Sequence, residues 1–419
     1  MAIVPTLRLA HWIIVQDLRD LMKYLNILGY ICIPLAALVH YWIGHGKSWE
    51  HTVTFILAAL GVIPLAHLMG EATEHLSEKT GPTLGGLLNA TFGNAAEIII
   101  GVIALTKGLN DIVKASLTGS ILGNLLLVAG ASMVVGGWKR EKQVFSRGAA
   151  EANAGLLVVA VAAMLMPAIF DLTGHATHAK NLADNEEKVS IGTSIVLLIV
   201  YVLGLIFTLR THKHIFSREP STSDEQKHGL EGVQGAWSVK RSVITLLAAS
   251  VGVGIVAEWL VDSADHMGNS LGWSPVFVGV ILLAIIGNAA EHSTAVLLAI
   301  KDDMDTAMTI CYQSSIQIAL FATPFLVLLS WSFWAFGMKG PDGHVLSPMN
   351  MVFTPMEVVS VVLSVGIVIV LAMNGETNWF EGALLLAMYA ILAIAFFYMP
   401  GEGGHGVQSA VTAGGGAPR

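Results

Sequence analysis

Apolar stretches recur along almost the whole chain, and most of them are long enough to cross a membrane. They lie near residues 24–43, 52–70, 84–106, 112–136, 148–170, 189–210, 241–262, 272–299, 306–336, 352–372 and 378–399. About 20 consecutive apolar residues span the hydrocarbon of a bilayer as a helix. The pattern predicts an all-α polytopic membrane protein with about eleven transmembrane helices. Because the long stretch 306–336 contains Pro324, we expect one kinked or tilted helix there.

Composition supports this class and removes others. Of the 419 residues, 54% are hydrophobic and 12% are charged, and the mean hydropathy is +0.68, whereas soluble domains carry about 25% charged residues. The net charge of -8 is spread over the loops, so no nucleic-acid surface is indicated. Cys32 and Cys311 lie in apolar runs without metal or redox spacing, which predicts two packed thiols.

Lysine and arginine indicate the orientation, because they are retained on the cytoplasmic side. With the N-terminus inside, most of the 22 Lys and Arg residues fall on the inner side, including those of the two richest loops, 139–147 and 210–241. This assignment places the C-terminus outside or in a lumen. It fits an integral protein of a bacterial inner membrane or a vacuolar membrane.

The pentapeptide GNAAE occurs twice, at 93–97 and at 287–291, and its flanking residues keep their spacing. An odd number of predicted helices separates the copies, so the second copy enters the membrane from the opposite side. Inverted repeats of this kind are typical of secondary transporters, whose substrate binds near the midplane between the halves. The matching flanks are Glu71, Glu78, Gly81 and Ser120 in the first copy and Glu258, Asp265, Gly268 and Ser314 in the second.

The repeat divides the chain into five parts. Residues 1–50 hold an N-terminal surface segment and one peripheral transmembrane helix, and 51–210 form the first five-helix repeat. Residues 211–240 are a cytoplasmic linker, and 241–400 form the second, inverted five-helix repeat. The tail 401–419, rich in glycine and small residues, is predicted to be disordered.

Each GNAAE copy places a carboxyl group well inside the hydrocarbon. An ionised carboxylate is costly there unless it is protonated, paired or ligated. Glu97 and Glu291 occupy matching positions, which suggests one shared site. A helix-packing role for protonated glutamates is the simpler alternative, but it does not explain why the whole motif is duplicated.

Glycine followed by asparagine is a poor helix interior, so we expect a local break before each glutamate. Carboxylates, amide oxygens and freed carbonyls are hard donors of the kind that Ca²⁺ binds, about six to eight at a time. With no thiolate present and His292 expected to point away, softer metals are disfavoured. The predicted donors of Ca²⁺ are Glu97, Glu291, Asn94, Asn288, Gly93 and Gly287.

Competition at these oxygens predicts exchange. Protons and Ca²⁺ neutralise the same two carboxylates, so Glu97 and Glu291 are also the predicted proton-binding groups. If the empty, doubly ionised site is too costly to carry across, the protein changes its open side only when loaded, which is antiport. No phosphate-binding loop and no domain of ATPase size is present, so we expect a transporter, not an enzyme. No cofactor is indicated, and Ca²⁺ is a transported substrate.

Other polar residues are candidates for an additional site or for the pathway. The helices after each motif carry four that either complete the coordination or only pack polar surfaces together: Ser120, Asn124, Ser314 and Gln317. Acidic residues at the two mouths either recruit cations or are solvated helix ends: Glu71, Glu74, Glu78, Glu258, Asp262 and Asp265. We interpret Asp302, Asp303 and Asp305 as a loop and a helix cap.

At these residues the chain resembles the Ca²⁺/H⁺ exchangers of the CAX type in the calcium/cation antiporter superfamily. The resemblance rests on the stretches 64–97, 116–130, 207–216, 287–296 and 378–397 and covers most of residues 50–400. It implies eleven helices, two inverted five-helix repeats after the first helix, and Ca²⁺ bound between Glu97 and Glu291. Relatives differ in their selectivity among Ca²⁺, Mn²⁺ and Na⁺.

Two other functions fit parts of the pattern. A Na⁺-driven exchanger shares the repeat but needs further sites for monovalent ions. A channel also selects cations with facing acidic residues, although channels usually build symmetric pores from identical subunits. The predicted partners are Ca²⁺, protons and the lipid bilayer, with no nucleic acid, and the sequence is compatible with a homo-oligomer.

Overall fold

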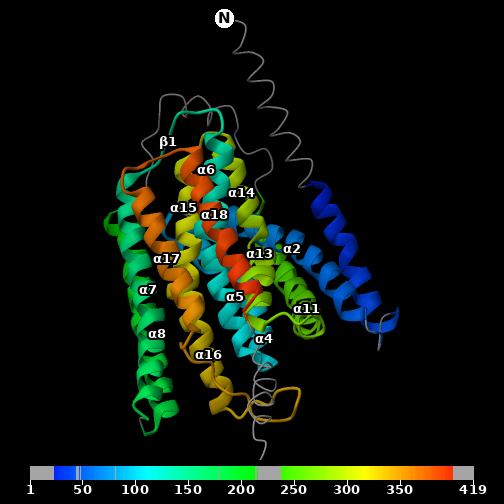
Figure 1. The fold of residues 1–419 in the computed structure, drawn as a ribbon. Helices are drawn as coiled ribbons and strands as arrows, with labels where there is room; N and C mark the ends of the chain where they lie inside the picture. Colours follow the sequence, from blue (N-terminus) through cyan, green and yellow to red (C-terminus); the bar gives the residue numbers. More distant parts are fainter. Residues whose placement is uncertain are drawn as a thin grey trace, which may run out of the picture.

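The computed structural model describes residues 23–43, 47, 49–80, 82–178, 180–212, 215 and 237–399. The N-terminal surface segment, much of the central linker and the C-terminal tail therefore lie outside the described residues. The described part is a bundle of long helices that run between two ends of the molecule (Figure 1). The prediction of an all-α polytopic membrane protein is confirmed, because nine of the described helices are long and apolar enough to cross a membrane.

The helix Lys23–Ile43, which ends in η1 (Val39–Ile43), comes first. It lies at the edge of the molecule against α2 (Figure 1), as predicted for a peripheral helix. The other elements of the first half are α2 (Glu50–Thr80), α3 (Pro82–Phe92), α4 (Ala95–Thr106), α5 (Asn110–Leu122), η2 (Gly123–Val128), α6 (Ala129–Gly137), β1 (Gln143–Val144), α7 (Arg147–Ala176), α8 (Leu182–Ile206) and η3 (Phe207–Thr211).

The second half of the described chain begins at Val239 and is also mostly helical. Its elements are α11 (Val239–Leu271), α12 (Pro275–Phe277), η4 (Val278–Leu283), α13 (Ala284–Gly287), α14 (Ala289–Ile300), α15 (Met304–Gln317), η5 (Ile318–Ala322), α16 (Thr323–Ala335), α17 (Pro355–Ala372), β2 (Glu376–Thr377) and α18 (Trp379–Phe397). The α12–α13 run and α14 meet at a bend of 60°, and this pair is a tenth span if it crosses the membrane as one. The count of eleven and the inverted relation of the halves stay predictions.

Four predicted boundaries were wrong by more than about four residues. The spans predicted at 148–170 and 189–210 belong to α7, which ends at Ala176, and to α8, which begins at Leu182. The spans predicted at 52–70 and 241–262 are parts of α2 and α11, which reach Thr80 and Leu271. Hydropathy placed the ends too early, because both helices continue beyond the apolar stretch into turns that carry carboxylates. The two long helices pack along one another (Figure 1).

Five segments of the described spans are π-helical, and the sequence analysis did not foresee them. Two of these, η1 and η3, end their spans, and η2, η4 and η5 lie inside. Two of them, η2 and η5, follow α5 and α15 at matching places in the two halves. At η5, Thr323 donates both its N–H and, at 2.8 Å, its hydroxyl to the Ile318 carbonyl five residues earlier, and Pro324 after it has no N–H to donate. The stretch 306–336 is one helical run, Met304–Ala335, as predicted.

Close glycine contacts fix the packing of α6 on α18. A Cβ on Gly130 would lie 2.9 Å from the Gly382 carbonyl oxygen, and a Cβ on Gly382 would lie 2.6 Å from the Gly130 oxygen. Real Cβ atoms do not approach backbone so closely, so both positions need glycine. The two helices therefore meet backbone to backbone.

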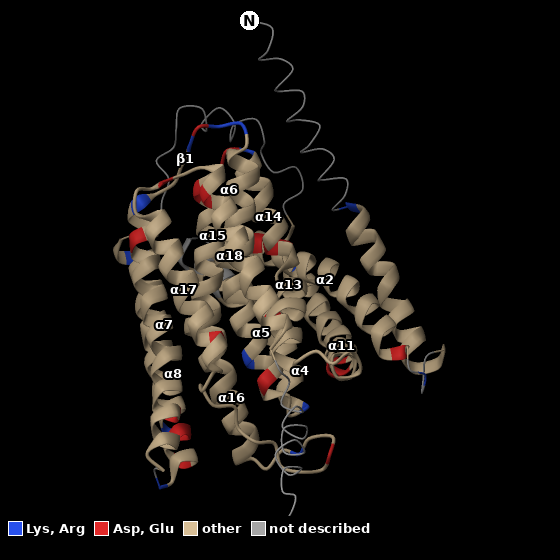
Figure 2. Ribbon diagram, viewed as in Figure 1, with Lys and Arg blue, Asp and Glu red and all other residues tan. Residues whose placement is uncertain are grey.

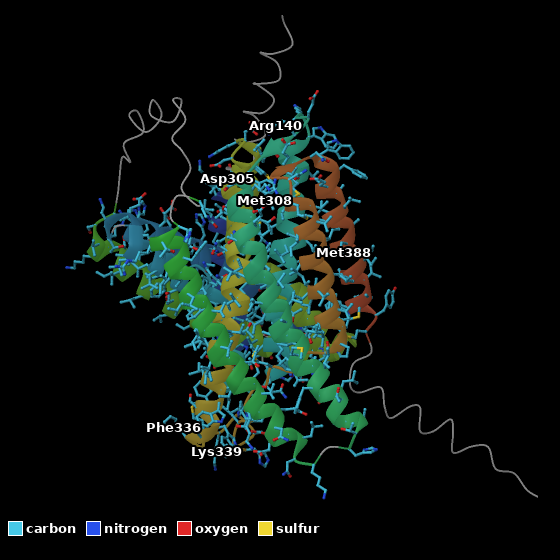
Figure 3. All side chains as sticks on the ribbon, turned by 90° about the vertical axis from the view of Figure 1, so that its left-hand side faces the viewer. Arg140, Asp305, Met308, Phe336, Lys339 and Met388 are labelled. Atoms are coloured by element: carbon cyan, nitrogen blue, oxygen red, sulfur yellow. The ribbon has the colours of Figure 1, made fainter. Side chains whose placement is uncertain are left out.

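Charged residues gather mostly at the two ends of the bundle (Figure 2). Figure 3 places Arg140 and Asp305 at one end and Phe336 and Lys339 at the other, so the run α15–η5–α16 extends along the molecule. The strands β1 and β2 pair antiparallel at the first of these ends. They tie the connection before α7 to the one before α18.

Candidate functional site

Both GNAAE motifs interrupt their helices, as the sequence predicted. The chain leaves the helix at 93–94, between α3 and α4, and at Asn288, between α13 and α14. Neither Asn94 nor Asn288 caps the helix that follows with its side chain. Both asparagines are buried, 2% and 0% exposed, so their amide groups must find partners elsewhere.

Those partners come from the opposite half of the chain. The Asn94 amide donates to Gln317 Oε1 at 2.5 Å, and its oxygen accepts from the Ser314 hydroxyl at 2.9 Å. The Asn288 amide donates to the Ser120 hydroxyl at 2.8 Å and to the Ala284 carbonyl at 3.0 Å. Each break is thus held by the helix that follows the other break.

Asn124 joins these two sets of bonds into one network. Its amide donates to Ser314 Oγ at 2.9 Å and lies 3.5 Å from Asn288 Oδ1. The structure therefore brings together all four residues that the sequence singled out on the following helices. We call the six connected residues the cross-half network: Asn94, Ser120, Asn124, Asn288, Ser314 and Gln317.

The two glutamates lie beside the cross-half network. Glu97 is 8% exposed, and its carboxyl group packs against the second break, with Oε1 3.6 Å from the position of a Cβ on Gly287. Glu291 is half-buried, and its Oε2 is buried with no hydrogen-bond partner among the described residues. The two carboxylates are close enough to repel one another when both are ionised. An unsatisfied carboxylate oxygen beside a second carboxyl group is suited to holding a cation or a proton.

The residues with softer donor atoms that the sequence analysis considered are His292, Cys32 and Cys311. His292 Nε2 is buried without a hydrogen-bond partner among the described residues, and the ring packs against η2, 3.8 Å from the position of a Cβ on Gly123. The ring therefore does not join the cross-half network. Cys32 and Cys311 are buried free thiols, as predicted.

The acidic residues of the mouths lie on the long helices and not in loops. Glu71 is half-buried on α2, and Glu74 and Glu78 are exposed on the turns that follow. Glu258 is exposed on α11. Their role as pathway residues stays a prediction.

Two acidic residues near the end of α11 have different surroundings. Asp262 is paired with the Lys107 ammonium at 2.6 Å. Asp265, half-buried, lines a cavity of about 320 Å³ together with Asp111 and Lys114. Because Asp262 already has a cationic partner, Asp265 is the better placed of the two to receive an arriving cation.

The predicted cap at 302–305 is present. The Asp303 carboxylate accepts from Thr306 N at 3.3 Å at the start of α15. Asp302 pairs with Arg140 at 3.1 Å, and Asp305 accepts from Ser146 N at 2.7 Å. This turn is therefore bound to the connection between α6 and α7.

Sequence reasoning missed two buried carboxyl groups, those of Glu50 and Glu357. Glu50, 5% exposed at the start of α2, lies 3.5 Å from His40 Nδ1. Glu357 is 2% exposed at the start of α17, where it forms a capping box with Thr354 and accepts from the Thr118 hydroxyl at 3.2 Å. The spacing of Thr354 and Glu357 before an apolar run is the signal that predicts such a cap. Glu357 thus joins α17 to α5 at Thr118, which is two residues before Ser120 of the cross-half network.

Comparison with known proteins identifies the family. The family model described as "Sodium/calcium exchanger protein" matches residues 50–210 and 241–398, which are the two halves described above. The chain belongs to this exchanger family. The resemblance that the sequence motifs indicated is thus confirmed, and the protein is a transporter and not an enzyme.

Within the exchanger family, the relatives are cation/proton antiporters by name. The chain is 42% identical over 358 residues to the Ca²⁺/H⁺ antiporter ChaA of Bacillus subtilis, covering 85% of this chain and 95% of that protein. It is 37% identical over 369 residues to the vacuolar cation/proton exchanger 2 of Arabidopsis thaliana, covering 87% of this chain and 79% of that protein.

Solved structures carry the same fold. The structure of native YfkE has a TM-score of 0.71 at 39% identity and covers 90% of this chain and 100% of its own. The H⁺/Ca²⁺ exchanger CAX has a TM-score of 0.61 at 12% identity and covers 91% of this chain and 93% of its own. At that identity the second likeness supports the fold alone.

Proposed function

We propose that this protein exchanges Ca²⁺ for protons across a membrane by alternating access, with Glu97 and Glu291 binding either ion in competition. The observation that carries the proposal is the position of the two carboxyl groups beside a hydrogen-bond network that both halves share. The names of the relatives, Ca²⁺/H⁺ antiporter and cation/proton exchanger, support the same substrates.

The donor set favours Ca²⁺. Carboxylate oxygens of Glu97 and Glu291 and amide oxygens of Asn94 and Asn288 are hard ligands, which Ca²⁺ prefers over nitrogen and sulfur donors. The orphaned Oε2 of Glu291 is the atom that most needs a cation or a proton. Gly287 has no Cβ, so the Glu97 carboxyl group lies close to the backbone of the second break, and Gly93 holds the matching position in the first motif.

Antiport follows from the cost of the empty state. With no ion bound, two like charges lie together in a buried place, and this repulsion disfavours passage through an occluded state. Either one Ca²⁺ or protons relieve it. The cross-half network links the two breaks, so a change at one glutamate is transmitted to the other half through hydrogen bonds.

The arrangement in the membrane is part of the proposal. We infer eleven crossings, with the broken pairs α3–α4 and α12–α14 each counting as one, an inverted second half, a cytoplasmic N-terminus and an outer or lumenal C-terminus. Fusions of a reporter enzyme to the 177–181 loop and to the 139–146 loop test this. Activity outside at the first and inside at the second supports the orientation, and the reverse contradicts it.

Transport by purified protein in liposomes tests the function. An imposed pH gradient should drive accumulation of ⁴⁵Ca²⁺, and Glu97→Gln or Glu291→Gln should reduce it to the level of empty liposomes. Glu151→Gln, a change of the same kind at an exposed glutamate of α7 that pairs with Arg147 at the surface, is the matched control and should keep transport. Full uptake by either central variant would remove the proposed role.

The same vesicles separate the rival function. The family model's name includes sodium, so a Na⁺ gradient at constant pH is the second arm of the experiment. We expect no uptake above background in this arm. Uptake driven by Na⁺ and not by protons would assign the protein to the Na⁺-driven class.

A further inference from the structure

A second group of cation-binding side chains lies far from the GNAAE motifs, where α7 and α8 meet. Asp171 and His175 are one turn apart near the end of α7, and Glu186 is in the second turn of α8. One ligand atom from each lies within 4.8 Å of the others. Acidic positions are visible at these ends of α7 and α8, opposite the end that carries β1 (Figure 2).

The geometry of α7 presents two of the ligands together. Residues four apart lie on the same face of a helix, and His175 Nε2 is 3.2 Å from Asp171 Oδ1. Glu186 comes from the neighbouring helix, and its carboxyl group is within hydrogen-bond distance of that of Asp171. Asp171 and Glu186 are both half-buried, while His175 is exposed and reachable from solvent.

Two carboxyl groups so close need a cation between them, either a proton or a metal ion. Of the nearby bases, Lys188 is engaged by Asp184 at 2.6 Å. His175 places its Nε2 beside the carboxylate oxygens of Asp171 and Glu186, and this nitrogen can donate a lone pair when the imidazole is neutral. When His175 is protonated it forms an ion pair with Asp171, and when it is neutral the three groups are an open set of ligands.

Their chemistry selects a different ion from the central site. Imidazole with carboxylates suits Zn²⁺ and similar first-row transition metals, whereas Ca²⁺ prefers oxygen donors throughout. Three protein ligands leave one tetrahedral position for water. We propose that Asp171, His175 and Glu186 form a second cation site, which binds a divalent transition metal and joins α7 to α8.

A bound ion would act on the segment that covers this end of the molecule. Glu186 lines a cavity of about 220 Å³ together with Ser190, Trp331 and Asn350. The Ser190 hydroxyl donates to the Glu186 carbonyl at 2.7 Å and accepts from Met351 N at 2.9 Å. The metal site is thus two hydrogen bonds away from the connection between α16 and α17.

Calorimetric titration of the purified full chain with Zn²⁺ tests the site. We expect one Zn²⁺ per chain, and a Kd raised at least about tenfold by His175→Ala and by Asp171→Asn. His178→Asn is the matched control: it removes an exposed imidazole three residues away, and asparagine tolerates the φ of 50° found there. Its Kd should equal that of the unchanged protein.

A second control separates this site from the centre. Glu291→Gln should leave Zn²⁺ binding unchanged, whatever it does to transport. Zn²⁺ binding that survives His175→Ala, that is lost in Glu291→Gln, or that is missing from the unchanged protein would overturn the proposal. Since His175 is exposed, His175→Ala keeps the fold and decides the matter even if Asp171→Asn does not fold.

Discussion

The two GNAAE motifs have the same five residues but different surroundings. Glu97 is almost fully enclosed, and its carboxyl group packs against the break of the other half. Glu291 is half-buried, and one of its oxygens has no hydrogen-bond partner among the described residues. The first break separates two short helices, whereas the second joins its helices at a bend of 60°.

The difference shows that the helix interruption is set by the motif itself, whereas the exposure of each glutamate is set by the residues packed around it. Glycine and asparagine produce the interruption in both copies, because this is a local backbone preference. Exposure differs because it depends on what the other half places against each glutamate. Two equal motifs in unequal surroundings are what one state of an alternating-access cycle requires, since the partner state exchanges their roles.

Shortening each glutamate by one methylene should break this comparison most strongly. Glu97→Asp withdraws a carboxyl group from an enclosed place that cannot adjust, and we expect initial ⁴⁵Ca²⁺ uptake to fall about 100-fold, the effect of a displacement of about 1 Å. Glu291→Asp should cost about tenfold, because Glu291 is the more exposed of the two residues and its surroundings can adjust more. Equal losses, or a larger loss at Glu291, would show that the difference in burial has no functional meaning.

Removing the buried amide of Asn288 should lower the free energy of unfolding. Asn288→Ala leaves Ser120 and the Ala284 carbonyl without this partner, and we expect a loss of about 2 kcal/mol, from the range of about 1–3 kcal/mol for buried polar groups left unpaired. Thermal unfolding in detergent measures it. Asn110→Ala, whose amide bonds to the exposed Ser347, is the control and should cost less than about 1 kcal/mol. A loss at Asn288 no larger than the control would contradict the network.

Proton competition should test whether the carboxylates act together. Lowering the pH protonates the free carboxylates, so Ca²⁺ must displace protons and its apparent KM rises. We expect a rise of up to about tenfold per pH unit for each competing proton, with a plateau at high pH. Uptake kinetics from about pH 6 to about pH 9 measure this rise. A KM independent of pH would mean that protons bind elsewhere.

The smallest effect should come from the mouth. Lys107→Met removes the partner of Asp262, whose side chain is 38% exposed, and a partly solvated ion pair contributes about 0–1 kcal/mol. We expect transport to change less than about twofold by the same measure. A loss of transport as large as that of Glu97→Asp would show that the mouth, and not the central site, limits transport.

The sequence predicted the parts of the site that arise from local preference. The duplicated motif, the breaks and the polar positions on the following helices were all visible as residue types at fixed spacing. The pairing of Asn94 with Gln317, and of Asn288 with Ser120, was not predictable, because it depends on how two halves pack. The ends of α2 and α11 were missed because carboxylates at Glu71 and Asp262 interrupt the hydropathy while the helix continues.

The π-helical segments were missed for a different reason. A π turn accommodates one more residue than an α turn, and nothing in a count of apolar residues reveals it. At η5 the pair Thr323-Pro324 is a sequence signal, because proline removes one helical bond and the threonine hydroxyl adds a bond to the carbonyl five residues before it. No comparable residue accounts for η2, which precedes α6.

The extra residue in η2 has a consequence for how the gene can change. Each residue added to or removed from an α-helix turns everything after it by about 100°. A one-codon deletion within 123–128 would therefore swing Gly130 away from Gly382 and press bulkier side chains onto the α18 backbone. A substitution in this stretch disturbs the contacts of one side chain, such as those of Asn124, whereas a change in its length disturbs every contact that follows.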